Sequence, residues 1–259
     1  MSVVCVQNIG QNGNQLFPTI LACITACIHN LNVKHFTNQL VKFKIPKQYD
    51  FVYDKVIHTN NPLHNSNKNM NIVMKRTYYQ NCNIFNPFRN KIKNEILDLP
   101  SVVPNKTDIV IHLRLDGFNH KGYNSHIIHP SWYINILENE TFDKLYIVMA
   151  TKSGRIKHKQ EPHKKIYLEH FSKFNHEIIS QNEYDDFNFI RKFDKIISSN
   201  STFSWWAAFC SDASIIYLPP YWESRMTKLS TIGDVSKIIR DSYVYVNIET
   251  MEKVPITFQ

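Results

Sequence analysis

A run of small hydroxyl residues that follows an apolar segment is the stretch of this sequence best suited to chemistry. Ile196 and Ile197 end the apolar segment, and an aromatic segment typical of a helix begins a few residues later. The first turn of a helix leaves four backbone N–H groups without partners and carries about half a positive charge. A diphosphate satisfies those groups, and nearby hydroxyls add further donors, although ordinary capping of the helix is an alternative. The candidate residues for binding a nucleotide sugar are therefore Ser199, Asn200, Ser201, Thr202 and Phe203.

A histidine and an arginine follow an earlier apolar strand, predicted at 108–113. A buried Arg114 requires an anionic partner, and its planar fork binds two phosphate oxygens at once and stabilises charge on a departing nucleotide. An internal ion pair with Asp116 or Asp186 is the alternative. His112 is a candidate hydrogen-bonding group for the donor, or a core histidine. Asp116 is a candidate general base or a turn-forming aspartate, so the candidate catalytic residues are Arg114 and Asp116.

Two neighbouring aspartates precede a helix predicted at 187–193. Asp185 suits the N-cap of this helix, where a side-chain oxygen accepts a backbone N–H. Asp186 is a candidate donor-binding residue, because a carboxylate matches the N1–H and the exocyclic amine of guanine. A divalent cation needs several oxygen ligands, and the sequence offers no convincing further set. We therefore predict no metal site and no cofactor other than the donor substrate.

A glycine-containing loop near the start of the chain is a second place where backbone can approach a ligand. Gly10 to Gly13 separate a strand predicted at 2–7 from an apolar helix predicted at 19–28. Glycine lets the chain come close to a ligand without a Cβ in the way, although a simple tight turn fits equally well. The candidate donor-side residues here are Gly13, Asn14 and Gln15.

The elements that position these residues alternate between strand and helix after Pro104. Apolar runs predict strands at 108–113, 145–149, 177–179, 195–197 and 215–218, with helices at 132–137, 166–174, 187–193 and 204–210 between them. This alternation predicts an α/β fold with a parallel sheet, in which ligands gather at the carboxyl ends of the strands. We predict an N-terminal α/β domain on the acceptor side at 1–104 and a nucleotide-sugar-binding, Rossmann-like domain at 105–259. The last segment, extended at 243–248, is expected to pack back on the first half.

Composition narrows the class of protein and its compartment. The chain has 259 residues, is 43% hydrophobic and carries a net charge of +8. Its basic residues are scattered except at 155–165, which we interpret as a solvated surface loop, and no nucleic-acid-binding signature accompanies them. The five cysteines lack C-x-x-C spacing, and no apolar run is long enough to span a membrane. These features predict a cytoplasmic protein without a nucleic-acid partner or a membrane span.

Three segments, in order along the chain, resemble the α-1,2-fucosyltransferase family. They are G-x-x-G-N-Q-L-F at 10–17, H-x-R at 112–114, and S-N-S-T-F-S-W-W-A-A at 199–208, which is followed by Leu218-Pro219. The resemblance implies a metal-independent, inverting glycosyltransferase with two Rossmann-like halves facing a central cleft, the GT-B arrangement. It implies GDP-fucose as donor and a galactose-like hydroxyl of a glycan as acceptor. Arg114 would contact the donor phosphates, His112 the nucleotide, and Ser201 and Thr202 the diphosphate.

The chain departs from the family in one motif. The family usually reads H-x-R-R-G-D, whereas this chain continues with Leu115, Asp116 and Gly117, so the second arginine is missing and the acid is displaced by one position. The alternatives are therefore a related glycosyltransferase that uses another nucleotide sugar, or an inactive module that binds nucleotides or glycans.

Overall fold

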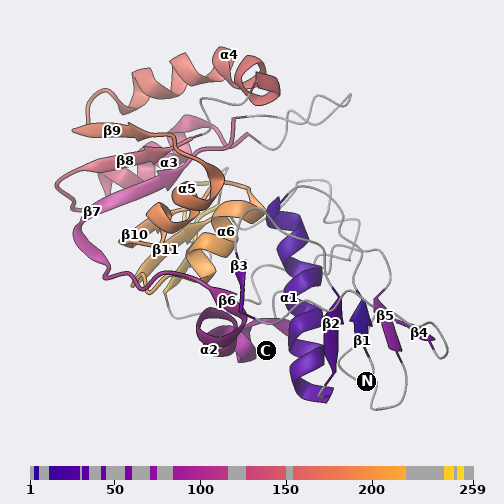
Figure 1. Cartoon of the computed structure of the whole chain (residues 1–259). Coiled ribbons are helices and arrows are strands. Elements are labelled where there is room, and N and C mark those ends of the chain that lie inside the picture. The colour runs from indigo at the N-terminus through magenta and orange to yellow at the C-terminus, as the bar shows by residue number, and fades with distance from the viewer. Residues whose placement is uncertain are drawn as a thin grey trace. The chain divides into compact units, whose positions relative to one another are not determined.

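The computed structural model describes residues 3–5, 12–29, 31–34, 42–44, 56–59, 71–74, 84–115, 127–149, 154–219, 242–247 and 250–253. The chain forms two compact units, 1–100 and 101–259, each with its own parallel sheet (Figure 1).

The N-terminal unit contains a four-stranded sheet in the order β2-β1-β5-β4, in which every pair of neighbours is parallel. Its strands are β1 (Val3–Cys5), β2 (Asn32–Lys34), β4 (Val56–Thr59) and β5 (Asn71–Met74). Asparagine-rich sequence around these short strands hides their periodicity, which is why β2 and β4 escape prediction from the sequence. The segment 51–53, whose Phe-Val-Tyr sequence predicts a short strand, lies outside the described residues.

Helix α1 (Asn12–His29) connects β1 to β2 and begins earlier than the sequence predicts. Gly13, Asn14 and Gln15 therefore lie in its first turn rather than in a loop, and Pro18 lies inside the helix rather than at its start. Burial explains the difference, since Leu16 and Phe17 are fully buried and their packing outweighs the poor helix propensity of the residues before them.

The remaining described elements of the N-terminal unit are a short irregular helical segment and an antiparallel pair of two-residue strands. The spacing of apolar residues over 86–97 predicts a helix, and the structure has η3 (Asn86–Phe88), α2 (Arg89–Lys91) and η4 (Ile92–Ile96) there, with π-helical geometry in η4. β3 (Lys42–Phe43) pairs antiparallel with β6 (Leu97–Asp98). Phe85, just before this segment, packs edge-to-face against Phe17 of α1, with ring centroids 5.6 Å apart.

The C-terminal unit contains a six-stranded sheet in the order β12-β11-β10-β7-β8-β9, and all of its pairings are parallel. The strands are β7 (Asn105–His112), β8 (Leu145–Val148), β9 (His176–Ile179), β10 (Phe193–Ile197), β11 (Ile215–Leu218) and β12 (Tyr243–Tyr245). The predicted parallel sheet of the C-terminal half is confirmed. β-branched and aromatic residues dominate these strands, as expected where both faces of a sheet are covered.

Helices cover both faces of this sheet (Figure 1). The helices are α3 (Pro130–Glu138), α4 (Gly154–Phe171), α5 (Glu183–Ile190) and α6 (Thr202–Phe209). Trp132 and Tyr133 of α3 and Phe171 of α4 pack in one apolar cluster with Ile109 and Ile111 of β7. Side chains alternate along a strand, so Val110 and His112 point to the opposite face, on the side of α5 and α6.

A buried arginine joins the ends of α5 and α6. Arg191 is the C-cap residue of α5 and is 3% exposed. Its Nη1 donates to Oδ1 of Asn188 at 2.6 Å, and its Nε donates to the carbonyl of Cys210, the C-cap residue of α6, at 3.3 Å. The guanidinium therefore satisfies a carbonyl at the negative end of one helix while it anchors the other.

Two predictions about this unit are wrong. The basic stretch at 155–165 lies on α4 and not in a loop, because the helix starts twelve residues before the apolar spacing becomes clear. α5 ends at Ile190, and Phe193 begins β10 instead. In the described part of the last segment, β12 pairs with β11 and extends the C-terminal sheet, and the expected packing of this segment on the first half stays a prediction. The segment 232–239, where the spacing of apolar residues predicts a helix, lies outside the described residues.

Candidate functional site

The strand order of the C-terminal sheet reverses between β7 and β10. From β7 the chain proceeds to β8 and β9 on one side, and it then returns to place β10, β11 and β12 on the other side. This is the order of the classic Rossmann fold, in which the chain leaves the two central strands in opposite directions and opens a crevice at their carboxyl ends. His112 ends β7, and Ser199 is the second residue after β10, so the reversal brings both predicted motifs to one place.

His112 is fixed at the carboxyl end of β7 by a hydroxyl and an aromatic ring. Its Nδ1 lies 2.8 Å from Oγ of Ser199, and its ring centroid lies 5.1 Å from that of Phe203 in α6. Phe203 in turn packs edge-to-face on Phe187 of α5 at 5.9 Å. Burial, with a smaller contribution from the positive charge of Arg114, lowers the pKa of His112 from 6.5 to about 3. The imidazole is therefore neutral at physiological pH, and it presents one donor and one acceptor.

Arg114 lies on the same side of the chain as His112. Leu113 and Leu115 are each 1% exposed and belong to the apolar cluster beneath α3 and α4, as do the odd-numbered isoleucines of β7. Alternation therefore turns Arg114 away from that cluster, and its Nη2 is buried while the whole side chain is partly exposed. Its positive charge adds to the effect of burial in lowering the pKa of His112.

The hydroxyl-rich turn enters α6 without an N-cap hydrogen bond from a side chain. Ser201 is the N-cap residue, with extended backbone (φ −145°, ψ 128°), but its hydroxyl accepts no bond from the first turn. The alternative in which the Ser201 hydroxyl caps the helix is therefore not seen in the structure. The N–H of Ser201 donates to the carbonyl of Ser199 at 2.8 Å, which makes Asn200 the centre of a three-residue turn. A helix that starts uncapped keeps its first N–H groups available to an anion.

The hydroxyl of Ser204 faces inward instead of adding a donor at the start of the helix. Its Oγ lies 2.8 Å from Oγ of Ser198 and donates to the carbonyl of Ser201 at 3.1 Å, and Ser204 has no exposed surface. Thr202, by contrast, is the first residue of α6 and is 7% exposed. Ser198 and Ser204 therefore hold the turn together, whereas the hydroxyls of Ser201 and Thr202 form no hydrogen bond with another described residue.

The N-cap of α5 is an asparagine and not one of the two aspartates that the sequence offers. Asn182 is the N-cap residue of α5, and its Oδ1 accepts from the N–H of Asp185 at 2.9 Å, so the prediction of Asp185 as the cap is wrong. Asp186 is 7% exposed, and its Oδ1 accepts from the N–H of Gln181 at 3.0 Å. Asparagine and aspartate cap helices equally well, so the sequence alone does not choose between them. Asp186 precedes Phe187, the residue that supports Phe203.

The other predicted residues lie elsewhere. Asp116 lies outside the described residues. Gly13 is buried and Asn14 and Gln15 are partly exposed, all three in the first turn of α1 in the N-terminal unit. Within the described part of the chain, no group of three or more His, Cys, Asp or Glu side chains is arranged to hold a metal ion. Among the described helices, none has the length and hydropathy needed to cross a membrane.

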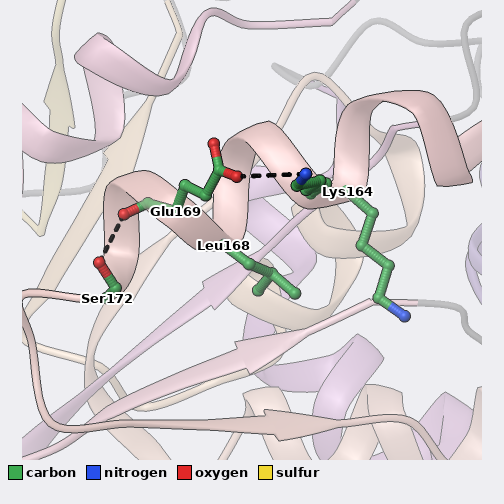
Figure 2. Close-up of a pocket in the computed structure, with 5 residues that line it drawn as sticks. Lys164, Leu168, Glu169 and Ser172 are labelled. Atoms are coloured by element: carbon green, nitrogen blue, oxygen red, sulfur yellow. Dashed lines mark hydrogen bonds and ion pairs between the residues drawn. The ribbon is translucent and has the colours of Figure 1, made fainter.

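A separate, open hollow of about 550 Å³ lies along the second half of α4 (Figure 2). It is lined by Lys164, Lys165, Leu168, Glu169 and Ser172. Lys165 and Glu169 form a highly exposed ion pair at 3.9 Å, which contributes little to stability. α4 ends where β9 begins, so the hollow lies toward the amino ends of the strands. No residue of the hollow belongs to the set that meets at the strand-order reversal.

Sequence reasoning missed two residues of the site, Phe187 and Ser198. Phe187 supports Phe203, and Ser198 holds the turn through Ser204. The aromatic residue at the start of α5 was visible as an apolar position, but only the packing of two helices places it beside the motif. The pairing of two serines across a turn leaves no trace in sequence periodicity.

Fold and site together define an α/β protein with a six-stranded parallel sheet and a group of polar side chains at its switch point. No family model, curated protein or solved structure matches this chain.

Proposed function

We propose that this chain is a glycosyltransferase that transfers fucose from GDP-fucose, with inversion, to a hydroxyl of a galactose-like sugar in a glycan acceptor. One observation carries the proposal. His112 and Ser199 are joined by a 2.8 Å hydrogen bond at the reversal of strand order, beside Arg114 and the uncapped start of α6. A neutral polar ring, a guanidinium and free helix N–H groups are complementary to a nucleoside diphosphate. The resemblance of the motifs at 112–114 and 199–208 to α-1,2-fucosyltransferases supports fucose as the transferred sugar.

The proposed reaction places negative charge where the site is positive. The bond between the anomeric carbon and the diphosphate oxygen breaks, and the acceptor oxygen forms a new bond to that carbon from the opposite face. The transition state resembles an oxocarbenium ion, as in glycoside hydrolysis. Arg114, the N-terminus of α6 and the hydroxyls of Ser201 and Thr202 stabilise the departing GDP. Asp116 is the proposed base for the acceptor proton, and Asp186 is the proposed partner of guanine.

We further propose a GT-B arrangement, in which the N-terminal unit faces the crevice and contributes Gly13, Asn14 and Gln15 to the donor side. We also propose a metal-independent enzyme that acts in the cytoplasm and has no nucleic-acid partner.

The deciding experiment is a screen of nucleotide sugars. Calorimetric titration of GDP, UDP, CDP and their sugar conjugates is expected to show selective binding of GDP and GDP-fucose. Transfer is then measured with galactose-terminated oligosaccharides, and slow hydrolysis of the donor is measured without acceptor. Tight binding of another nucleotide sugar in place of GDP-fucose would reassign the donor, and the absence of binding by any nucleotide would contradict the proposal.

A second candidate function is a binding module without catalysis. The observation that favours it is Leu115, which occupies the position of the second arginine of the related motif and is 1% exposed within the apolar cluster. A charged side chain at this position would be buried among aliphatic groups, so the chain has one guanidinium here where the related enzymes have two. Binding of GDP-fucose with neither hydrolysis nor transfer, over long incubation and with a broad set of acceptors, is the outcome that identifies the module.

A further inference from the structure

Asn200 carries a buried acceptor that the described residues leave unsatisfied. The residue is 9% exposed, its Oδ1 is buried, and no described group donates a hydrogen bond to it. Two neighbouring hydroxyls form bonds elsewhere, since Ser199 is bonded to His112 and Ser198 to Ser204, and the adjacent hydroxyl of Ser201 forms no hydrogen bond with this oxygen. Buried polar atoms are almost always paired, so an exception inside a candidate site points to a missing ligand group.

The chemistry of the amide oxygen selects the kind of ligand group. An amide oxygen only accepts hydrogen bonds, and the oxygens of an ionised diphosphate also only accept. Oδ1 of Asn200 therefore does not pair with the phosphates that we assign to the start of α6. Its partner is a donor group next to the diphosphate, and in a nucleotide sugar the groups on either side of the diphosphate are the ribose and the transferred sugar. Both carry hydroxyls.

We propose that Asn200 is a specificity-determining residue whose amide oxygen accepts a hydrogen bond from a sugar hydroxyl of the nucleotide sugar. This inference rests on the proposed function, because it takes the diphosphate to lie at the start of α6. It assigns to the turn between β10 and α6 two kinds of recognition. Ser201, Thr202 and the helix N–H groups bind the phosphates, and Asn200 distinguishes a ligand that has the hydroxyl from one that lacks it. A site with a buried acceptor strongly discriminates against a ligand that lacks the matching donor, because binding of that ligand leaves the acceptor unpaired.

The unliganded protein provides the first test. An unsatisfied buried acceptor destabilises the unliganded protein. Asn200→Ala is therefore expected to leave the thermal unfolding midpoint of the full-length, unliganded protein unchanged or to raise it. The matched control is Asn175→Ala, which removes an exposed asparagine just before β9, at the amino edge of the sheet. A clear fall of the midpoint in Asn200→Ala would show that the amide holds the fold together and would overturn the proposal.

Ligand binding provides the second test, as a double-mutant cycle between protein and ligand. Wild type, Asn200→Ala and Asn175→Ala are titrated with GDP, 2′-deoxy-GDP, 3′-deoxy-GDP and GDP-fucose. Asn200→Ala is expected to bind the hydroxyl-bearing ligand about fivefold to tenfold more weakly than wild type, and to bind the ligand without that hydroxyl as wild type does. Asn175→Ala is expected to bind every ligand as wild type does.

The pattern of losses identifies the hydroxyl. A loss with GDP that disappears with one of the deoxy nucleotides assigns the ribose, and a loss with GDP-fucose alone assigns the transferred sugar. Equal weakening for all four ligands would mean that the amide contacts the phosphates or the base, and unchanged affinity for all four would remove Asn200 from the site. Either result overturns this inference while the proposed function stands. Wild type that binds none of the ligands overturns both.

Discussion

Replacement of His112 with glutamine is expected to make the C-terminal unit less sensitive to acid. Burial and the charge of Arg114 lower the pKa of His112 from 6.5 to about 3 in the folded protein. Between these two values the unfolded chain binds a proton that the folded protein does not, so stability falls as the pH drops below 6.5. From pH 7.5 to pH 5 this single group lowers the free energy of unfolding by about 2 kcal/mol. Glutamine does not titrate and retains polar atoms for the contact with Ser199.

The assay is urea unfolding at the two pH values, followed by tryptophan fluorescence. This signal reports on the C-terminal unit, because all four tryptophans lie within 101–259, at positions 132, 205, 206 and 222. The quantity of interest is the change in unfolding free energy between pH 7.5 and pH 5, compared between proteins, so the contributions of the other histidines cancel. Wild type is expected to lose about 2 kcal/mol more than His112→Gln.

The control variant is His170→Gln, which replaces an exposed histidine in the last turn of α4. Its pH dependence is expected to match that of wild type. An identical pH dependence in wild type and His112→Gln would refute the reasoning, because it would show that His112 takes up its proton as readily in the folded protein as in the unfolded chain. Nuclear magnetic resonance titration of the ring protons then locates the pKa directly.

Four further outcomes are expected. Arg114→Lys should lower kcat at least about tenfold, since a point charge replaces a two-pronged donor, and a variant with wild-type kcat and donor affinity would make the arginine structural. Replacement of both Ser201 and Thr202 with alanine should weaken GDP binding by about 1–3 kcal/mol per charge-assisted hydrogen bond, while guanosine binds as before. Equal calorimetric affinities for GDP in variant and wild type would contradict phosphate binding by these two hydroxyls. Arg191→Met should lower the free energy of unfolding by about 2–4 kcal/mol in urea, because two partners at helix ends lose their donor, whereas the exposed neighbour Lys192→Met should change it by less than about 0.5 kcal/mol. Transfer measured after exhaustive chelation should persist, and activity that returns only with magnesium or manganese would exclude the proposed mechanism.

The sequence was most informative where one feature dominates the energy. β7, β8, β10 and β11 are runs of β-branched and aliphatic residues, and such runs are buried in any α/β fold. Because parallel strands end at the same edge of a sheet, the sequence also indicated that His112 and Ser199 lie at one edge, and the structure joins them by a hydrogen bond. It did not indicate that β7 and β10 are neighbours, since strand order depends on long-range pairing.

The sequence was least informative where similar local choices compete. Asn182 and Asp185 both have side chains suited to the N-cap of α5. The helix begins after Asn182, and with this start the carboxylate of Asp186 accepts a hydrogen bond from the N–H of Gln181. Gly13 permits a turn or a helix, and the burial of Leu16 and Phe17 decides for the helix. The inward hydroxyl of Ser204 and the unsatisfied oxygen of Asn200 depend on which groups lie within hydrogen-bond distance after folding, so no spacing rule reports them.

The contact between α3 and the segment after β12 has a consequence for the synthesis of the protein. The indole Nε1–H of Trp132 donates to the carbonyl of Val246 at 3.0 Å, and 114 positions separate the two residues along the chain. At a synthesis rate of 5–20 residues per second, Val246 is added about 6–23 s after Trp132. During that interval the nascent chain lacks one of the groups that cover this side chain, which the finished protein buries completely. We therefore expect chaperones to bind, or the nascent chain to aggregate, at α3 during the time before β12 is synthesised.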